Sequence, residues 1–332
     1  MIARFAIPFF FIMGLVVVPL VVALLCRWLM PRKHWRKGAV ASVVIIWALV
    51  LYGHFVGYQQ LVVERHDFTS ADVPQAFDGY RIVQFSDAHI GTMTGPREWL
   101  LQRAVDSINA LQPDLIVFTG DMQNIFPDEL HQHTSVLRQL KAKDGVMAVL
   151  GNHDYAVYQK VDSVEKERNC QQTVVNLRQM GFDLLLNEHR IIRRDSDSIV
   201  IAGMENWGKM KRMPRKGDVK KTLAGLNTSS PAGKGREEAS SPFIIMLQHD
   251  PTAWREKILP ECHAQLTLSG HTHGGQFSLF GWSPAVLSYD EWNEWTYEGR
   301  RALFVSSGLG ALIPFRLGMP GEIVEITLRC KK

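Results

Sequence analysis

The chain has 332 residues, of which 46% are hydrophobic, with 37 Lys and Arg against 33 Asp and Glu. This composition supports a large core and excludes disordered, collagen-like and disulfide-dense proteins. The formal charge of +4 is unevenly distributed: residues 1–60 carry +6 and contain no Asp or Glu, whereas the remainder carries −2. A near-neutral body argues against nucleic acid as a partner.

Two long uncharged runs occupy the N-terminal segment. They cover Phe5–Cys26 and Gly38–Val63, and each exceeds the roughly 20 residues that a helix needs to cross a hydrocarbon core. The first run is longer than the apolar core of a signal peptide, and no small-x-small site follows it. We therefore expect a membrane anchor of two transmembrane helices over 1–63, a polar connector over 64–79 and one domain over 80–332.

The charge between the two runs predicts an orientation. Five basic residues lie there: Arg27, Arg32, Lys33, Arg36 and Lys37. The positive-inside rule places such a short loop in the cytoplasm. We expect a multi-pass protein of the cell (inner) membrane, in contact with membrane lipids, whose domain over 80–332 is extracytoplasmic.

Beyond residue 80 the hydrophobic pattern alternates between strands and helices, which predicts an α/β fold. Apolar strands are expected at 81–85, 114–119, 145–150, 243–247 and 265–268, and shorter strands near 183–187, 190–194, 198–203, 302–306 and 322–328. Helices are expected at 97–111, 129–141 and 168–180.

Polar residues follow the five apolar strands and form the candidate site. They are Asp87, His89, Asp121, Asn152, His153, His249, His271 and His273. Ligands of α/β sheets lie at the carboxyl ends of the strands, so these side chains can converge. Oxygen and imidazole donors without thiolate suit Mn, Fe, Zn or Mg. More than four candidates predict two metal ions, which repel one another and require a bridging carboxylate.

The order of these motifs resembles a known family. Asp87-x-His89, Gly120-Asp121, Gly151-Asn152-His153-Asp154, His249 and Gly270-His271-x-His273 occur in the order of the calcineurin-like metallophosphoesterase superfamily, over about residues 80–328. The runs Leu266–Gln276 and Pro314–Gly318 are also similar to its branch of membrane-anchored bacterial phosphodiesterases. The resemblance implies a four-layer α/β/β/α sandwich preceded by the transmembrane hairpin.

The resemblance also implies roles for the residues. One divalent ion (Mn, Fe or Zn) is held by Asp87, His89 and His273, and a second by Asn152, His249 and His271, with Asp121 bridging them. A hydroxide shared by the two ions attacks phosphorus in such enzymes. His153 then stabilises or protonates the leaving oxygen, and Asp154 is a candidate to orient His153.

Differences between this sequence and related branches of the superfamily limit the substrates that we expect. Asp121 is followed by Met122-Gln123-Asn124, unlike in the protein Ser/Thr phosphatases, and His153 stands where soluble UDP-diacylglucosamine pyrophosphatases usually have Arg. We expect a metal-dependent phosphoric ester hydrolase, a phosphodiesterase, acting on a phosphate ester or pyrophosphate that could be lipid-linked. Two alternatives stay open: a UDP-2,3-diacylglucosamine pyrophosphatase-like enzyme of lipid A synthesis, and a non-catalytic membrane-bound binding protein on the same fold.

Two further segments each admit two interpretations. Lys209–Lys221 contains seven Lys or Arg and one Asp, and it either contacts lipid phosphates or an anionic substrate or is a solvated loop. The aromatic segment after the last metal motif contains Trp282, Tyr289, Trp292 and Trp295. These side chains either line an acyl or base pocket or pack in the core.

Overall fold

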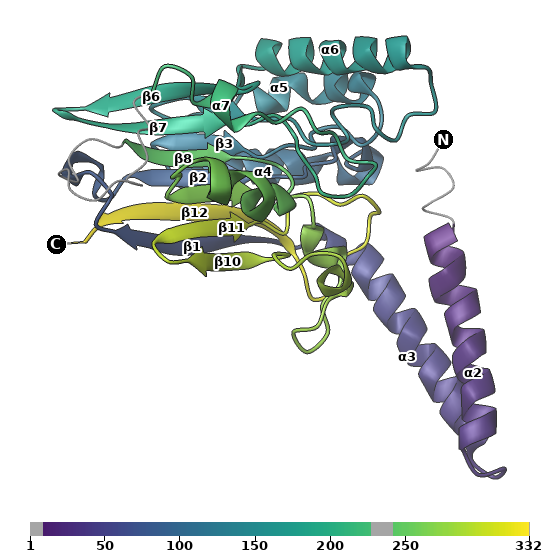
Figure 1. Cartoon of the computed structure of the whole chain (residues 1–332). Coiled ribbons are helices and arrows are strands. Elements are labelled where there is room, and N and C mark those ends of the chain that lie inside the picture. The colour runs from purple at the N-terminus through teal and green to yellow at the C-terminus, as the bar shows by residue number, and fades with distance from the viewer. Residues whose placement is uncertain (1–8, 227–241, 332) are drawn as a thin grey trace.

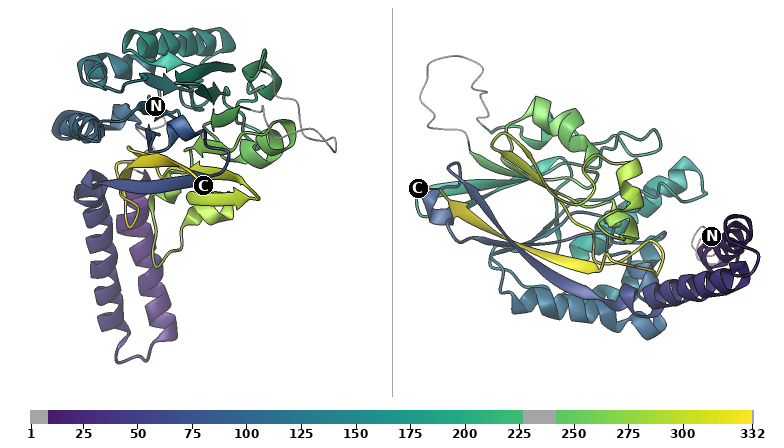
Figure 2. Two further views of the ribbon diagram at one scale, coloured as in Figure 1. Left: turned by 90° about the vertical axis from the view of Figure 1, so that its left-hand side faces the viewer. Right: turned by 90° about the horizontal axis from the view of Figure 1, so that it is seen from below.

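A helical hairpin projects from a body in which two stacked β-sheets lie between layers of helices (Figures 1 and 2). The computed structural model describes residues 9–226 and 242–331. The α/β class, the four-layer sandwich and the preceding apolar hairpin are confirmed.

The hairpin consists of two apolar helices. A π-helical turn, η1 (Met13–Val17), leads into α2 (Val18–Leu29), and α3 (Trp35–Phe55) continues into the 3₁₀ turn η2 (Gly57–Gln59). The spans Phe9–Leu29 and Trp35–Gln59 are long and apolar enough to cross a membrane. The second uncharged run extends to Val63, but helical structure ends at Gln59 because the next residues pair with a strand.

The first sheet has the strand order β1-β12-β2-β3-β4-β5. Its strands are β1 (Leu61–Ser70), β12 (Gly321–Cys330), β2 (Arg81–Phe85), β3 (Leu115–Phe118), β4 (Val146–Ala148) and β5 (Asp183–Leu184). The polar stretch expected as a connector over 64–79 begins instead in β1, which pairs in parallel with β12 from Leu61 to Ser70. Its polarity reflects an edge strand, on which Arg65, Asp67 and Thr69 are exposed while Phe68 and Ser70 are buried.

The second sheet has the order β10-β11-β9-β8-β7-β6. Its strands are β10 (Glu294–Glu298), β11 (Arg301–Val305), β9 (Leu266–Ser269), β8 (Phe243–Leu247), β7 (Asp197–Gly203) and β6 (Glu188–Arg194). The strand β10 is not among those expected from the sequence, because Glu at both ends and a half-buried centre give it no apolar run.

Helices cover both outer faces of the sandwich (Figure 2). Those on the first sheet include α4 (Trp99–Ala110), α5 (Thr134–Leu137) and α6 (Ser163–Gln179), and those on the second include α7 (Val219–Thr222), η7 (Trp254–Ile258) and α8 (Leu259–Glu261). The helix expected at 129–141 is a 3₁₀ turn, η6 (Pro127–His133), followed by α5. Further 3₁₀ turns are η3 (Gln75–Phe77), η4 (Ile90–Thr92), η5 (Gly95–Arg97), η8 (His273–Gln276) and η9 (Pro284–Leu287).

Strand directions place the hairpin and the candidate site on the same side of the body. Strand β1 is parallel to β12, and β12 is antiparallel to β2. The start of β1, where α3 enters the sheet, is therefore at the carboxyl end of β2. The parallel strands β3 and β4 end at the same edge.

Candidate metal centre

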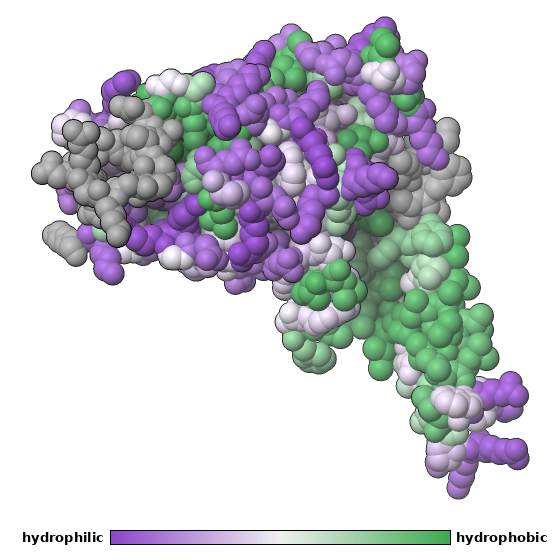
Figure 3. Space-filling model, viewed as in Figure 1, coloured by the Kyte–Doolittle hydropathy of each residue, from purple (hydrophilic) through white to green (hydrophobic). Residues whose placement is uncertain are grey.

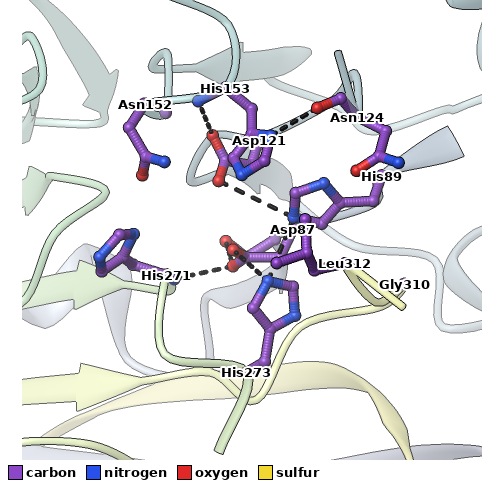
Figure 4. Close-up of polar contacts among 12 residues, drawn as sticks. Asp87, His89, Asp121, Asn124, Asn152, His153, His271, His273, Gly310 and Leu312 are labelled. Carbon is purple, nitrogen blue, oxygen red and sulfur yellow. Dashed lines mark hydrogen bonds and ion pairs between the residues drawn. The ribbon is translucent and has the colours of Figure 1, made fainter. Parts of the chain in front are cut away.

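The eight candidate side chains predicted from the sequence converge at the carboxyl ends of β2, β3, β4, β8 and β9. Figure 4 labels all of them except His249. Three groups of potential ligand atoms each lie within 4.8 Å of one another: Asp87, His89 and His273; His89, Asp121 and His153; and Asp121, His249 and His271. The first two groups share His89 and the last two share Asp121, so the potential ligand atoms form one continuous cluster.

The first group brings β2 and the loop after β9 together. The Nε2 atoms of His89 and His273 lie 3.1 Å apart, and the His273 Nε2 is 3.4 Å from the Asp87 carboxylate. Two imidazole nitrogens and one carboxylate oxygen thus face the same point.

The second group is centred on His249, which follows β8. Its Nε2 lies 3.0 Å from the side-chain oxygen Oδ1 of Asn152, 3.1 Å from Nδ1 of His271 and 3.2 Å from Oδ2 of Asp121. Its Nδ1 contacts the backbone carbonyl of Thr119 at 2.8 Å, which fixes the ring so that Nε2 points into the site.

Asp121 lies between the two groups. Its Oδ2 is 3.8 Å from Nε2 of His89 and 3.2 Å from Nε2 of His249. Its Oδ1 accepts a hydrogen bond from the backbone N–H of His153 at 2.8 Å. The carboxylate thus faces ring nitrogens of both groups and is held in place by the loop after β4.

The loops that carry the site have unusual backbone conformations. Asp87, His89, Asp121, His271 and His273 all have φ between 42° and 75°, in the left-handed region. This region costs a non-glycine residue about 1–2 kcal/mol, and such strain concentrates at functional sites.

One glycine permits a close approach between the two sheets. A Cβ on Gly270 would collide with Oγ of Ser86 and Oδ2 of Asp87. Because this side chain is absent, the next backbone N–H, that of His271, can donate to Oδ2 of Asp87 at 2.9 Å.

Burial controls the protonation of the site. It lowers the pKa of His89 and of His273 well below the usual value, with the neighbouring positive groups adding to the effect, so both imidazoles are neutral. Burial raises the pKa of Asp121, but His249 and His153 outweigh this and hold the pKa well below its usual range. Burial alone would lower the pKa of His249, yet the charge and hydrogen bond of Asp121 raise it to about 10.

This donor set fits divalent cations. Metal ligands must be neutral imidazoles and ionised carboxylates, and His89, His273 and Asp121 meet this condition. Within residues 9–226 and 242–331, the buried Oδ1 of Asp87 has no hydrogen-bond partner. A buried carboxylate oxygen without a donor is costly, and a cation would satisfy it.

His153 lies beside the first group. Its Nδ1 is 2.5 Å from the backbone carbonyl of Asn124, and its ring meets that of His89 edge to face at 4.6 Å. The carboxylate of Glu129 accepts the backbone N–H groups of 124–126 and so fixes the loop that presents this carbonyl.

Asp154 has a different position from the one considered from the sequence. Its carboxylate accepts the backbone N–H groups of Gly151, Asp121 and Met122, at 2.9, 2.8 and 3.0 Å. Burial and the neighbouring charge of Asp121 raise its pKa to about 7. It therefore links the loops after β3 and β4, whereas the carbonyl of Asn124 contacts the His153 ring.

The aromatic segment divides between the two interpretations. The hydroxyl of Tyr289 is 2.8 Å from Nε2 of His271, so this residue belongs to the site. Trp295 packs against Phe68 and Phe304 between the sheets. Trp282 does neither, since it is 50% exposed.

Sequence reasoning did not identify two residues at the rim of the site. The amide of Asn152 donates to the hydroxyl of Tyr158 at 3.2 Å, and the exposed guanidinium of Arg212 lies 5.8 Å from the Tyr158 ring. One residue of the basic segment therefore borders the site, whereas Lys209 pairs with Glu256. A lone Tyr has no sequence signal, but Arg212 lies in the segment singled out for its charge.

Comparison with known proteins is consistent with this geometry. A family model described as calcineurin-like phosphoesterase matches residues 80–275. A transmembrane protein with metallophosphoesterase domain from Danio rerio is 31% identical over 304 residues, covering 88% of this chain; the chain spans 63% of that protein's length. An uncharacterised metallophosphoesterase of Bacillus subtilis, YkuE, is 30% identical over 318 residues, covering 90% of this chain and 98% of the relative. Among solved structures, a Thermus thermophilus sulfate thiohydrolase has a TM-score of 0.42 at 13% identity, covering 72% of this chain and 53% of its own.

Proposed function

The chain belongs to the calcineurin-like phosphoesterase family, and on that premise we propose that it is a membrane-anchored phosphodiesterase that holds two divalent cations. The observation that carries the proposal is the position of Asp121, whose carboxylate lies within 4.8 Å of ring nitrogens in two groups of histidines. Membership of the family makes the chain a metal-dependent phosphoric ester hydrolase; the preference for diesters and the number of cations are proposed.

The ligands are divided between two cations. Asp87, His89 and His273 hold one, Asn152, His249 and His271 hold the other, and Asp121 contributes to both. Mn, Fe and Zn all suit these oxygen and nitrogen donors. When bound, such cations activate water as a nucleophile and stabilise negative charge on phosphoryl oxygens.

In this proposal, His153 stabilises or protonates the leaving oxygen. The carbonyl of Asn124 accepts from Nδ1, which leaves Nε2 as the nitrogen that exchanges a proton. A diester hydrolysed without such an acid has to expel an alkoxide, so the position of this ring beside the metal ligands supports a catalytic role.

We further propose that the protein is a multi-pass protein of the inner membrane, with its body outside the cytoplasm. The two apolar spans, the name of the Danio rerio relative and the basic connection between α2 and α3 support this topology.

With this topology, the substrate is a phosphate ester or pyrophosphate that the enzyme reaches from the outer side of the membrane. UDP-diacylglucosamine, a cytoplasmic nucleotide lipid, is disfavoured. Protease added to intact spheroplasts should digest the body. Complete protection would contradict this orientation and place the body in the cytoplasm.

Hydrolysis of bis-p-nitrophenyl phosphate by the full-length protein in detergent tests the activity. Activity should vanish after chelation and return with Mn, Fe or Zn, at about two ions per chain. The monoester p-nitrophenyl phosphate is the matched comparison. Faster hydrolysis of the monoester would contradict the diester preference, and activity that survives complete metal removal would contradict the proposed chemistry.

A further inference from the structure

An apolar loop projects from the body next to the metal centre. We define it as residues 277–287, which follow η8 and include η9. No charged residue occurs between His273 and Asp290. The exposed large side chains of this loop are all apolar: Leu279, Phe280, Trp282, Val286 and Leu287. Soluble surfaces rarely gather such residues, and a cluster of this kind marks an interaction surface.

The tip of the apolar loop displays an aromatic ring. Leu279 and Trp282 exchange backbone hydrogen bonds of 2.9 and 3.1 Å, which close a two-residue turn. Phe280 and Gly281 occupy the turn with φ of 52° and 79°. Asn or Gly is favoured at the first of these positions, yet it holds a Phe that is 100% exposed. Full exposure means that this ring is not packed against residues 9–226 or 242–331.

The base of the apolar loop is bound to the segment 313–317. Ser278 donates its backbone N–H to the carbonyl of Leu317 at 2.7 Å, and the N–H of Leu317 donates to the carbonyl of Gln276 at 3.0 Å. The side-chain amide of Gln276 also donates to the carbonyls of Ile313 and Phe315.

The segment 313–317 is in turn bound to α3. The backbone N–H of Arg316 donates to the carbonyl of Gly53 at 3.0 Å, and the ring of His54 contacts the carbonyl of Pro314 at 2.7 Å. Side chains larger than hydrogen at Gly53 and Gly57 would collide with Phe315 and with the carbonyl of Arg316. The loop, this segment and the membrane helix therefore form one continuous unit.

The place on α3 at which segment 313–317 is bound gives the depth of this unit in the membrane. The uncharged run begins at Gly38, so the roughly 20 residues that cross about 30 Å of hydrocarbon end near Gly57. Segment 313–317 contacts Gly53 and Gly57 and thus lies at the boundary of the bilayer. The apolar loop extends below the body on the same side as the hairpin (Figure 1), and its apolar surface lies beside that of the hairpin (Figure 3).

We propose that the apolar loop inserts into the surface of the lipid bilayer beside the hairpin. Two residues of the metal centre flank the loop: His273 lies at the start of η8, which precedes it, and Tyr289 follows it closely. Its insertion brings that centre to the level of the lipid headgroups. Given the proposed phosphodiesterase function, the substrate is a phosphodiester carried by a membrane lipid, because the phosphate of such a lipid lies at this level.

A spin label tests the insertion without reference to activity. The label is attached to Phe280→Cys in the full-length chain, with the half-buried Cys26 and Cys330 replaced by alanine, and the protein is placed in vesicles of phosphatidylcholine and phosphatidylglycerol. Val164→Cys is the matched control, because Val164 is a 68% exposed apolar residue on α6. Oxygen, which concentrates in lipid, should relax the label at 280 more than an aqueous nickel chelate does, and the control should show the reverse. Equal aqueous exposure at both positions overturns the insertion.

A pair of substrates with the same leaving group tests the substrate class. One is soluble bis-p-nitrophenyl phosphate, and the other is the p-nitrophenyl ester of phosphatidic acid in the same vesicles; water adds to phosphorus and p-nitrophenol leaves in both. Phe280→Asp should lower turnover of the lipid ester about tenfold, while the soluble ester is hydrolysed as before. Equal rates on the lipid ester for Phe280→Asp and wild type overturn the assignment. Failure of the wild type on both esters refutes the phosphodiesterase function, while the label at 280 still reports on insertion.

Discussion

The two sheets contribute different chemistry to the metal centre. The loops of the first sheet provide both carboxylates, Asp87 and Asp121, together with Asn152 and two histidines. The proposed ligands from the loops of the second sheet are all histidines, namely His249, His271 and His273, and the buried Asp250 lies 3.6 Å behind His271. Each proposed cation takes ligands from both sheets, since Asp121 follows β3 and faces His249 after β8. Neither sheet alone holds a complete site.

The contrast extends to the contacts between the sheets. Away from the site the sheets meet through apolar side chains such as Val117, Leu247 and Leu268. At the site they meet through charged side chains and hydrogen bonds, such as the one from the His271 backbone N–H to Asp87 and the contact of His249 Nδ1 with the Thr119 carbonyl. The apolar region stabilises the sandwich without any ligand, whereas the polar region depends on what it binds. Bound cations should therefore hold the two sheets together and stabilise the folded state.

The largest expected effect follows from the shared carboxylate. Asp121→Asn keeps the shape but removes the negative charge that faces both groups of histidines, so turnover of bis-p-nitrophenyl phosphate should fall by about 10³-fold or more. Asp128→Asn is the matched control, because the Asp128 side chain is 85% exposed. Metal content measured on the same samples should fall only for Asp121→Asn. Unchanged turnover in that variant would refute the shared position.

Chelation should loosen the contact between the sheets. Ligands that bind only the folded state at 100 times their dissociation constant add about 2.7 kcal/mol, so removing the cations should lower the Tm by about 5 °C or more. Thermal unfolding of the detergent-solubilised protein, with and without chelator, measures this shift. The shift should be smaller in His249→Ala, which already lacks one histidine from the second sheet. An identical Tm with and without chelator would contradict the proposal that bound cations stabilise the contact between the sheets.

His153 belongs to the first sheet but is not a proposed ligand, so its removal should slow turnover without releasing metal. His153→Ala should reduce the turnover of a diester with an alkyl leaving group about 100-fold, and that of bis-p-nitrophenyl phosphate much less, because the weakly basic p-nitrophenolate anion leaves without protonation. His131→Ala is the control, since this side chain is 61% exposed. An equal loss on both esters would contradict the role in protonation.

The sequence predicts those parts of the fold that depend on local patterns. Buried strands read as apolar runs, and the five that carry the site appear at their expected positions. Strands β1 and β10 were not predicted, because both are polar and are defined by their partners, β12 and β11. Pairing between residues far apart in the chain has no local signature.

In the candidate site, too, residues next to a local sequence pattern were predicted and residues defined by distant contacts were not. The eight residues at strand ends were identified because each stands beside an apolar run, and the structure brings them together; their individual roles stay predictions. The partners of those residues were not identified, since Asn124 acts through a backbone carbonyl and Tyr158 through one hydroxyl. Such contacts depend on loop conformation, including the left-handed backbone at Asp87 and His271, which residue types alone do not determine.

The smallest expected effect concerns the rim, where the segment after β7 in the second sheet approaches Tyr158 of the first. Arg212 is exposed, so water and salt screen its charge and its contribution to binding an anionic ester is modest. Arg212→Ala should raise KM for bis-p-nitrophenyl phosphate by about threefold to tenfold and leave kcat unchanged, since the residue is not among the proposed ligands. Arg215→Ala is the matched control, because the Arg215 guanidinium lies over Trp207 at 5.6 Å. If the two variants shift KM equally, the basic segment acts through its general field and Arg212 has no specific contact with the substrate.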